Sequence, residues 1–218
     1  MTITPQEAEF EQGMEELYEE FRKQYEDEVI FDKVHTFYKN NPEIVKEPYL
    51  NLDVSKELYD KKFYTASFIH SIIAVEVVIK VIALKPILYS LSFDSRASEL
   101  LYNDTFKQKS IPYIPSFYYE ILKDLTKINI KEIIRNNSQI KIWEEINHLQ
   151  SMRNKIIHQG VFVQKVDSER ALDIAIYIFN EIIPKILDRF QYHVEHYKIC
   201  YGSRDYIKMI SKIDNGKK

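Results

Sequence analysis

The sequence predicts an all-α protein built as a helical bundle. Glycine is scarce, with 4 residues among 218, and glycine is the residue that tight hairpin turns and phosphate-binding loops use most. Apolar residues recur at spacings of three and four along several long segments, which is the period of amphipathic helices. The one short β-like run is VFVQKV at 161–166. These observations argue against β-rich folds, P-loop proteins and Rossmann domains.

The N-terminal segment predicts an acidic amphipathic helix. TPQE at 4–7 matches the capping box, with proline at the first helical position. Residues 1–30 carry ten acidic and two basic side chains, a net charge of −8, so the rest of this chain of net charge −3 carries +5. We expect an arm over residues 1–45 that packs on the body and is interrupted at NNPE, 40–43. Its apolar stripe consists of Phe10, Met14, Leu17, Tyr18, Phe21 and Tyr25.

A second helix is expected from about Ser55 to residue 85. Between residues 69 and 84 it is apolar on almost every side, which is typical of a buried central helix, and Pro86 should kink or end it. Glu76 and Lys80 interrupt this run at i, i+4, with the glutamate first, which is the favourable order for an ion pair. They fit a paired charge at the edge of the core and the polar wall of a site equally well.

The middle of the chain is less regular. A helix is expected over 94–108, a loop with two prolines follows, and residues 118–137 suggest one or two short helices. Lys123, Lys127 and Lys131 lie in a basic stretch with nearby tyrosines. Positive charge next to aromatic side chains can bind single-stranded nucleic acid, so these lysines are candidate RNA-binding residues.

The next helix carries the main candidate site. It should begin near Gln139 and end at Gly160, which occupies the place of a C′ glycine. Each helical residue turns by about 100°, so Asn154 and His158 share a face, whereas Arg153 lies about 140° from His158. Arginine and histidine could still serve one site if the arginine bends around, if the helix ends before His158, or if a second chain supplies a second copy.

A long final helix is expected over 167–201, with Pro184 as the candidate for a kink. His193 and His196 would lie on it at i, i+3 with Glu195 between them. A metal site there is an open alternative, but an exposed polar helix face is favoured because no HExxH pattern or cysteine pair supports it.

Compartment and domain boundaries follow from the remaining composition. Cys200 is the only cysteine, so neither a disulfide within the chain nor a cysteine-based zinc site is expected, as suits a reducing cytoplasm. The N-terminus lacks the basic and apolar regions of a signal peptide, and no run of about eighteen uncharged apolar residues predicts a membrane span. We expect a cytoplasmic protein with the arm at 1–45, the bundle at 46–202 and a basic tail at 203–218.

The stretch RNKIIH at 153–158 resembles the R-x(4–6)-H motif of the HEPN superfamily, in its common Arg-Asn form. The setting is also similar, because the motif precedes the last long helix and follows an apolar helix that often carries a polar residue, a place that Glu76 could fill. The resemblance covers about residues 55–200 and leaves out the acidic arm. It implies a compact α-helical bundle.

Many HEPN proteins are metal-independent endoribonucleases of phage defence, toxin–antitoxin pairs and CRISPR effectors, and the motif commonly meets its copy in a dimer. The resemblance implies that His158 is the general acid/base in transfer of the RNA 2′-hydroxyl to phosphorus, which suits its near-neutral pKa. Arg153 would neutralise charge on the phosphate in the transition state. Asn154 would orient the histidine or bind the phosphate. The implied partners are RNA, a second copy and an antitoxin or defence protein, with no cofactor, metal or membrane.

The sequence departs from the pattern of some HEPN toxins at one point, and it also permits two other functional interpretations. Some HEPN toxins continue as His-x-Tyr, the tyrosine being nucleotidylated by an antitoxin, whereas here Gln159 and Gly160 follow His158. That regulation is therefore not expected at this position. The second interpretation is a non-catalytic HEPN module that binds RNA or a partner protein. The third is a helical structural protein.

Overall fold

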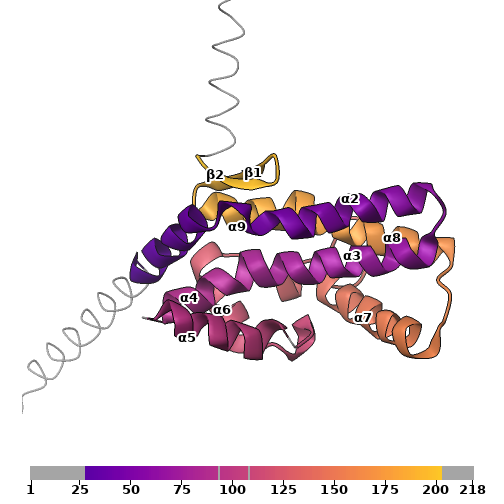
Figure 1. Ribbon diagram of the computed structural model, residues 1–218, viewed down its shortest axis with the longest axis horizontal. Helices are drawn as coiled ribbons and strands as arrows, with labels where there is room; N and C mark the ends of the chain where they lie inside the picture. Colours follow the sequence, from indigo (N-terminus) through magenta and orange to yellow (C-terminus); the bar gives the residue numbers. More distant parts are fainter. Residues whose placement is uncertain (1–27, 93, 108, 203–218) are drawn as a thin grey trace, which may run out of the picture.

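The computed structural model describes residues 28–92, 94–107 and 109–202, and it is mostly helical, as predicted (Figure 1). The expected helix after TPQE and the basic tail at 203–218 lie outside these residues. Helix covers 28–40, and a 3₁₀ turn at NNPE separates it from the next helix. The α-helices are α2 (Lys46–Asp60), α3 (Tyr64–Val78), α4 (Lys85–Leu91), α5 (Ser95–Tyr102), α6 (Ser116–Thr126), α7 (Ile142–Gln159), α8 (Lys165–Tyr177) and α9 (Ile183–Arg189).

Shorter elements join these helices. Three 3₁₀ turns occur in the described residues, at Pro42–Val45, Ile111–Tyr113 and Ile130–Glu132. Three π-helical turns occur there too, at Ile79–Leu84, Asn103–Lys107 and Ile178–Ile182. An antiparallel hairpin of β1 (Tyr192–Glu195) and β2 (Lys198–Tyr201) follows α9.

The helix expected over 55–85 is two helices, so that prediction is wrong at its start. The chain reverses between α2 and α3, with Lys62 at φ 64°, and the two helices lie side by side (Figure 1). Ser55 does not begin a helix but is buried inside α2. Its Oγ donates a hydrogen bond to the Ser67 carbonyl oxygen at 2.8 Å and lies 2.6 Å from Ser71 Oγ. A polar contact thus fixes how α2 sits on α3.

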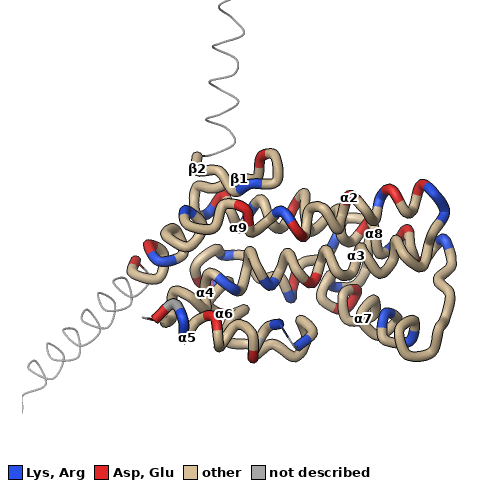
Figure 2. The backbone as a smooth tube through the Cα atoms, in the orientation of Figure 1, with Lys and Arg blue, Asp and Glu red and all other residues tan. Residues whose placement is uncertain are grey.

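Helix α3 is the central element, as its composition predicts. It packs against both α2 and α8, and few charged residues lie along it (Figure 2). The apolar helix continues through a π-helical turn into α4, and this turn takes up the irregularity before Pro86. Tyr64–Leu91 is the one helix among the described residues with the length and composition to cross a membrane, but 72% of its most apolar window is buried inside the protein. Burial to this extent is typical of the core helix of a soluble protein.

The C-terminal region departs most from the expectation. The chain is helical from Lys165 to Arg189, interrupted by a π-helical turn just before Pro184, and the predicted continuation to residue 201 is wrong. Gln191, at φ 62°, redirects the chain into the hairpin instead. The β-like run at 161–166 forms no strand: residues 161–164 connect α7 to α8, with Val163 buried and Phe162 84% exposed, and the last two residues begin α8.

Candidate functional site

Helix α7 places the Arg-Asn-x-x-x-His stretch at its C-terminal end. Gly160 adopts φ 66° and its N–H donates to the Ile156 carbonyl oxygen at 3.0 Å, which confirms the predicted cap. The rotation of α7 is set by an apolar face that is buried against the bundle. With that face inward, Asn154 and His158 are exposed to solvent. The buried apolar residues of α7 are Ile142, Ile146, Leu149 and Ile156.

Arg153 points toward the central helix and joins the two interrupting charges there. Its Nη1 lies 3.3 Å from Glu76 Oε2, and Lys80 Nζ lies 2.7 Å from Glu76 Oε1. The side chains of Glu76 and Lys80 are 12% and 8% exposed, and that of Arg153 is 28% exposed. Glu76 and Lys80 thus form the predicted paired charge at the edge of the core, and Glu76 also contacts Arg153; whether they line a site stays a prediction.

The geometry narrows how arginine and histidine could share one site. Helix α7 runs to Gln159, so it does not end before His158. Arg153 is tethered to Glu76 rather than bent toward the exposed face that carries His158. Of the three arrangements that would unite the two side chains, a second chain is the one that needs no change in this geometry.

The guanidinium of Arg153 is incompletely satisfied. Its contact with Glu76 is a single long ion pair, and its Nε is buried without a hydrogen-bond partner. Two further polar atoms of α7 share this condition, Gln150 Nε2 and Asn147 Oδ1. The three residues follow one another at intervals of three and so lie along one side of the helix. Buried polar groups usually have partners, so this side of α7 has unused capacity for hydrogen bonds.

Exposed apolar side chains surround the end of α7. Ile157 lies beside His158, and Val161, Phe162 and Val166 follow in the connection to α8 and its first turn; all four are exposed. Near them, Phe63, at the start of α3, is also exposed and lines the same shallow cavity as Phe162. Contiguous exposed apolar side chains of this kind mark interaction sites.

The three candidate RNA-binding lysines lie away from the motif. Lys123 Nζ lies 3.5 Å from Glu120 Oε2, and Lys127 ends α6 in the left-handed conformation. Lys131 Nζ stands 4.6 Å from the ring centre of Tyr119 and 5.5 Å from that of Trp143, on α7. Ten residues separate Trp143 from the arginine of the motif, or about 15 Å along the helix. The structure brings one lysine to the far end of the motif helix.

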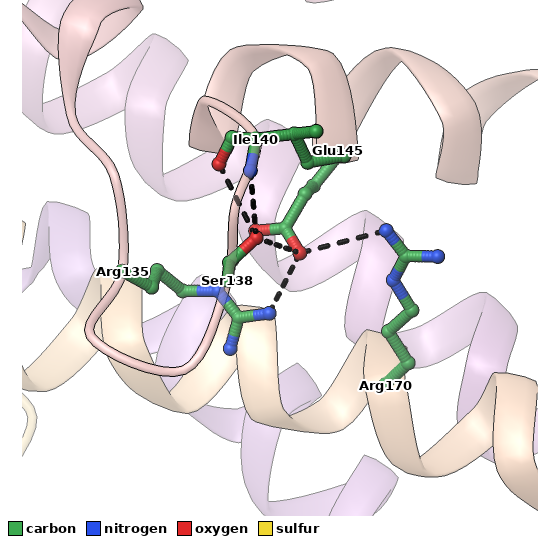
Figure 3. Close-up of polar contacts among 5 residues, drawn as sticks. All are labelled: Arg135, Ser138, Ile140, Glu145 and Arg170. Atoms are coloured by element: carbon green, nitrogen blue, oxygen red, sulfur yellow. Dashed lines mark hydrogen bonds and ion pairs between the residues drawn. The ribbon is translucent and has the colours of Figure 1, made fainter.

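A second polar centre, which the sequence did not reveal, fixes the start of α7 (Figure 3). Arg135 donates from Nε and Nη2 to the two carboxylate oxygens of Glu145, each at 2.8 Å, and both side chains are buried. Ser138 Oγ and Arg170 Nη2 approach the same carboxylate at 3.3 and 3.5 Å. The available signal was an acidic residue within the apolar pattern of α7.

The electrostatics of this centre favour its charged form. Burial opposes ionisation of Glu145, but the hydrogen bonds and charge of Arg135 outweigh it, so the pKa of Glu145 lies below its usual range. The same hydrogen bonds raise the pKa of Arg135. Asp173, which lines the adjacent cavity of about 450 Å³, has its pKa raised by burial. The buried carboxylate is committed to Arg135, so we assign the centre a structural role.

The histidines of HVEH do not lie on a helix face, so the favoured interpretation of them is wrong. His193 and Glu195 belong to β1, and His196 lies in the hairpin turn. Cys200, on β2, pairs directly with His193 across the strands. A cysteine that could act as a further metal ligand therefore lies opposite His193, but only the folded hairpin brings the two residues together.

Comparison with family models, curated proteins and solved structures finds no match for this chain. The protein is therefore classified from its own fold. It is a mostly helical bundle in which one helix ends in an Arg-Asn-x-x-x-His stretch, with the asparagine and histidine exposed and the arginine tied to the central helix.

Proposed function

We propose that this chain is a cytoplasmic, metal-independent endoribonuclease of the HEPN type, acting as a phage-defence or toxin–antitoxin effector. The observation that carries the proposal is the end of α7. Asn154 and His158 are open to solvent on one face, and next to them Arg153 is held by one long ion pair. A guanidinium held so loosely can exchange its carboxylate for an RNA phosphate, which offers matching bidentate geometry.

The chemistry needs a base, an acid and a positive charge. His158 takes the proton of the RNA 2′-hydroxyl, the 2′-oxygen attacks phosphorus, and the bond to the 5′-oxygen breaks to leave a 2′,3′-cyclic phosphate. The departing 5′-oxygen takes a proton from water, and protonated His158 later returns its own proton to the solvent, so each site needs one His158 and one Arg153. Arg153 stabilises the charge on the phosphoryl oxygens. Every proton is accounted for without a metal.

Dimerisation through the end of α7 is part of the proposal. Ile157 and Phe162 flank His158 with exposed apolar surface, and burying such surface favours association. A two-fold axis close to this surface would bring each His158 near the partner's Arg153. The second copy would then close a site that is open in one chain.

The first experiment is cleavage of RNA by the purified protein in EDTA. We expect His158→Ala to slow cleavage by about 10²–10⁴-fold, the usual contribution of general acid–base catalysis. His148→Ala is the matched control, because His148 is also exposed on α7 but lies outside the motif, and it should cleave normally. Circular dichroism in the same buffer must show that each protein stays folded. No cleavage by the folded wild type, or equal cleavage by both histidine variants, would rule out the enzyme.

The second experiment tests whether the site is shared. Arg153→Ala and His158→Ala proteins are each expected to be inactive. When equal amounts are unfolded and refolded together, half of the dimers are mixed, and each mixed dimer keeps one intact site of two, so about a quarter of wild-type activity returns. A site contained in one chain predicts no recovery.

The second candidate function, a non-catalytic RNA-binding module, is favoured by the pairing of Arg153 with Glu76, which gives the arginine a structural partner in place of a catalytic role. It predicts that RNA binds without cleavage, and that His158→Ala leaves the affinity unchanged.

A further inference from the structure

The hairpin after α9 brings three metal-binding side chains to one place. His193 and Cys200 face each other across the strands, and Glu195 lies two residues beyond His193, so all three lie on one face. One ligand atom from each, an imidazole nitrogen, the thiol sulfur and a carboxylate oxygen, lies within 4.8 Å of the others. Nothing in the bundle's packing requires these residue types together.

The state of His193 points to a ligand. Its side chain is 7% exposed, and its Nδ1 lies 2.9 Å from the Gly202 carbonyl oxygen, which can only accept a hydrogen bond. Nδ1 therefore carries the hydrogen, and in the neutral ring Nε2 offers a lone pair. This Nε2 is buried without a hydrogen-bond partner, and the carboxylate of Glu195 stands 3.9 Å away, too far for one. A backbone carbonyl that fixes the far nitrogen is the usual arrangement of a metal-bound histidine.

We propose that this hairpin binds one Zn²⁺ ion through His193 Nε2, Cys200 Sγ and the Glu195 carboxylate. Nitrogen and thiolate donors suit zinc, whereas calcium and magnesium take oxygen ligands. One thiolate and one carboxylate neutralise the charge of the ion. His196 Nδ1 lies 3.7 Å from the second Glu195 oxygen, and its exposed side chain is the candidate for the fourth ligand.

The distances require little rearrangement. Zinc holds its ligands at about 2.0–2.3 Å in a tetrahedron, so the ligand atoms stand about 3.3–3.8 Å apart. His193 Nε2 and the Glu195 carboxylate, 3.9 Å apart, need little contraction, and none of the three separations exceeds 4.8 Å; the Glu195 side chain is 54% exposed and has room to adjust. His193, the ligand that cannot move, is already oriented.

The metal would fix a hairpin that touches two other parts of the chain. Tyr192 Oη donates to the His35 carbonyl oxygen at 3.1 Å, and Tyr197 Oη donates to Asp53 Oδ2 at 2.7 Å. The hairpin thus connects the helix at 28–40 with α2. Its turn also places two non-glycine residues, His196 and Tyr197, at positive φ, a conformation that a bound ion would help to hold. The site is structural and separate from RNA cleavage.

Cobalt(II) is the first probe, because a thiolate bound to it gives a charge-transfer band and tetrahedral coordination gives intense visible bands. Titrating the metal-free full chain should produce both with one ion per chain, and Zn²⁺ should abolish them. Cys200→Ser, a near-isosteric change, should lose the charge-transfer band. Glu195→Gln should bind Zn²⁺ more weakly by more than the roughly 10–100-fold that loss of an outer-shell partner costs. His148→Ala should bind as the wild type does.

Two further measurements, which use Zn²⁺ in place of cobalt, complete the test. Zn²⁺ should raise the Tm of the wild type but not of Cys200→Ser, and it should protect Cys200 from alkylation, measured by mass spectrometry. If cobalt gives no thiolate band with the folded wild type, or if alkylation proceeds equally fast with and without Zn²⁺, the site does not exist. Equal Zn²⁺ affinities of wild type and Cys200→Ser would likewise overturn it.

Discussion

Replacing Glu145 by glutamine should be among the most damaging single changes in this protein. The carboxylate is 2% exposed and receives two hydrogen bonds of 2.8 Å from Arg135, which is itself 7% exposed. Removing one partner of a buried ion pair costs about 3–5 kcal/mol, because the other charge is left without compensation. Glutamine keeps one acceptor oxygen for the guanidinium, so we expect the lower end, about 3 kcal/mol. Arg170 is 41% exposed and adds little.

Urea unfolding followed by circular dichroism measures this loss, which should lower the midpoint by roughly 1 M. Glu57→Gln is the matched control, because Glu57 pairs with Lys61 on the surface, and it should leave the midpoint almost unchanged. The double variant Arg135→Met with Glu145→Leu should recover most of the loss, since an apolar pair leaves no buried charge. If Glu145→Gln and Glu57→Gln shift the midpoint equally, the buried pair does not stabilise the fold.

The ion pair between Glu145 and Arg135 also determines how stability depends on pH. The pKa of Glu145 in the folded protein lies below that of an unfolded glutamate, which is about 4.3. Its contribution is therefore complete above that value and is lost as the pH falls through the lower, folded-state pKa. The stability difference between wild type and Glu145→Gln should shrink in acid, because protonated glutamate and glutamine are both neutral. A difference that stays constant from neutral pH into strong acid would contradict this account.

Three further changes test the packing of the motif helix and of the helix pair α2–α3. Gln150→Met should raise stability by about 1 kcal/mol, because it replaces a buried amide nitrogen that has no hydrogen-bond partner with an apolar group of similar volume. Urea unfolding measures the change, and a loss of stability would show that the amide makes a favourable interaction. Ser55→Ala should cost about 1–2 kcal/mol in the same assay, since Ser71 loses its partner. Gly160→Ala should cost about 1 kcal/mol from its φ of 66° alone, because its Cβ would meet open space; Gly160→Asn should cost less, and equal losses would point to another cause.

The sequence was sufficient for elements whose signal is periodic and local. The motif helix, its glycine cap and the buried character of α3 follow from apolar spacing and from one residue with a known conformational preference. The break between α2 and α3 gave no such signal. The reversal uses Lys62 at positive φ, a conformation that glycine would have marked.

The hairpin was missed for the same physical reason. Its turn is made by His196 and Tyr197, both at positive φ, rather than by the Asn-Gly or Asp-Gly pair that marks such turns. Scarcity of glycine argues against tight turns only where other residues do not adopt the left-handed conformation. The contact between Arg153 and Glu76 joins positions 77 apart, so spacing could suggest either residue but not their meeting.

The two ends of α7 are held to the bundle by charges of unequal strength, and this difference suits the proposed function. At the start, Glu145 is buried and bound by two short hydrogen bonds, which hold the helix firmly. At the end, Arg153 keeps one contact of 3.3 Å and is partly open to solvent. An RNA phosphate can displace a carboxylate from an arginine most easily where the existing ion pair is long and partly hydrated. The helix is therefore fixed at the end that must not move, and its arginine can change partner at the end where RNA would bind.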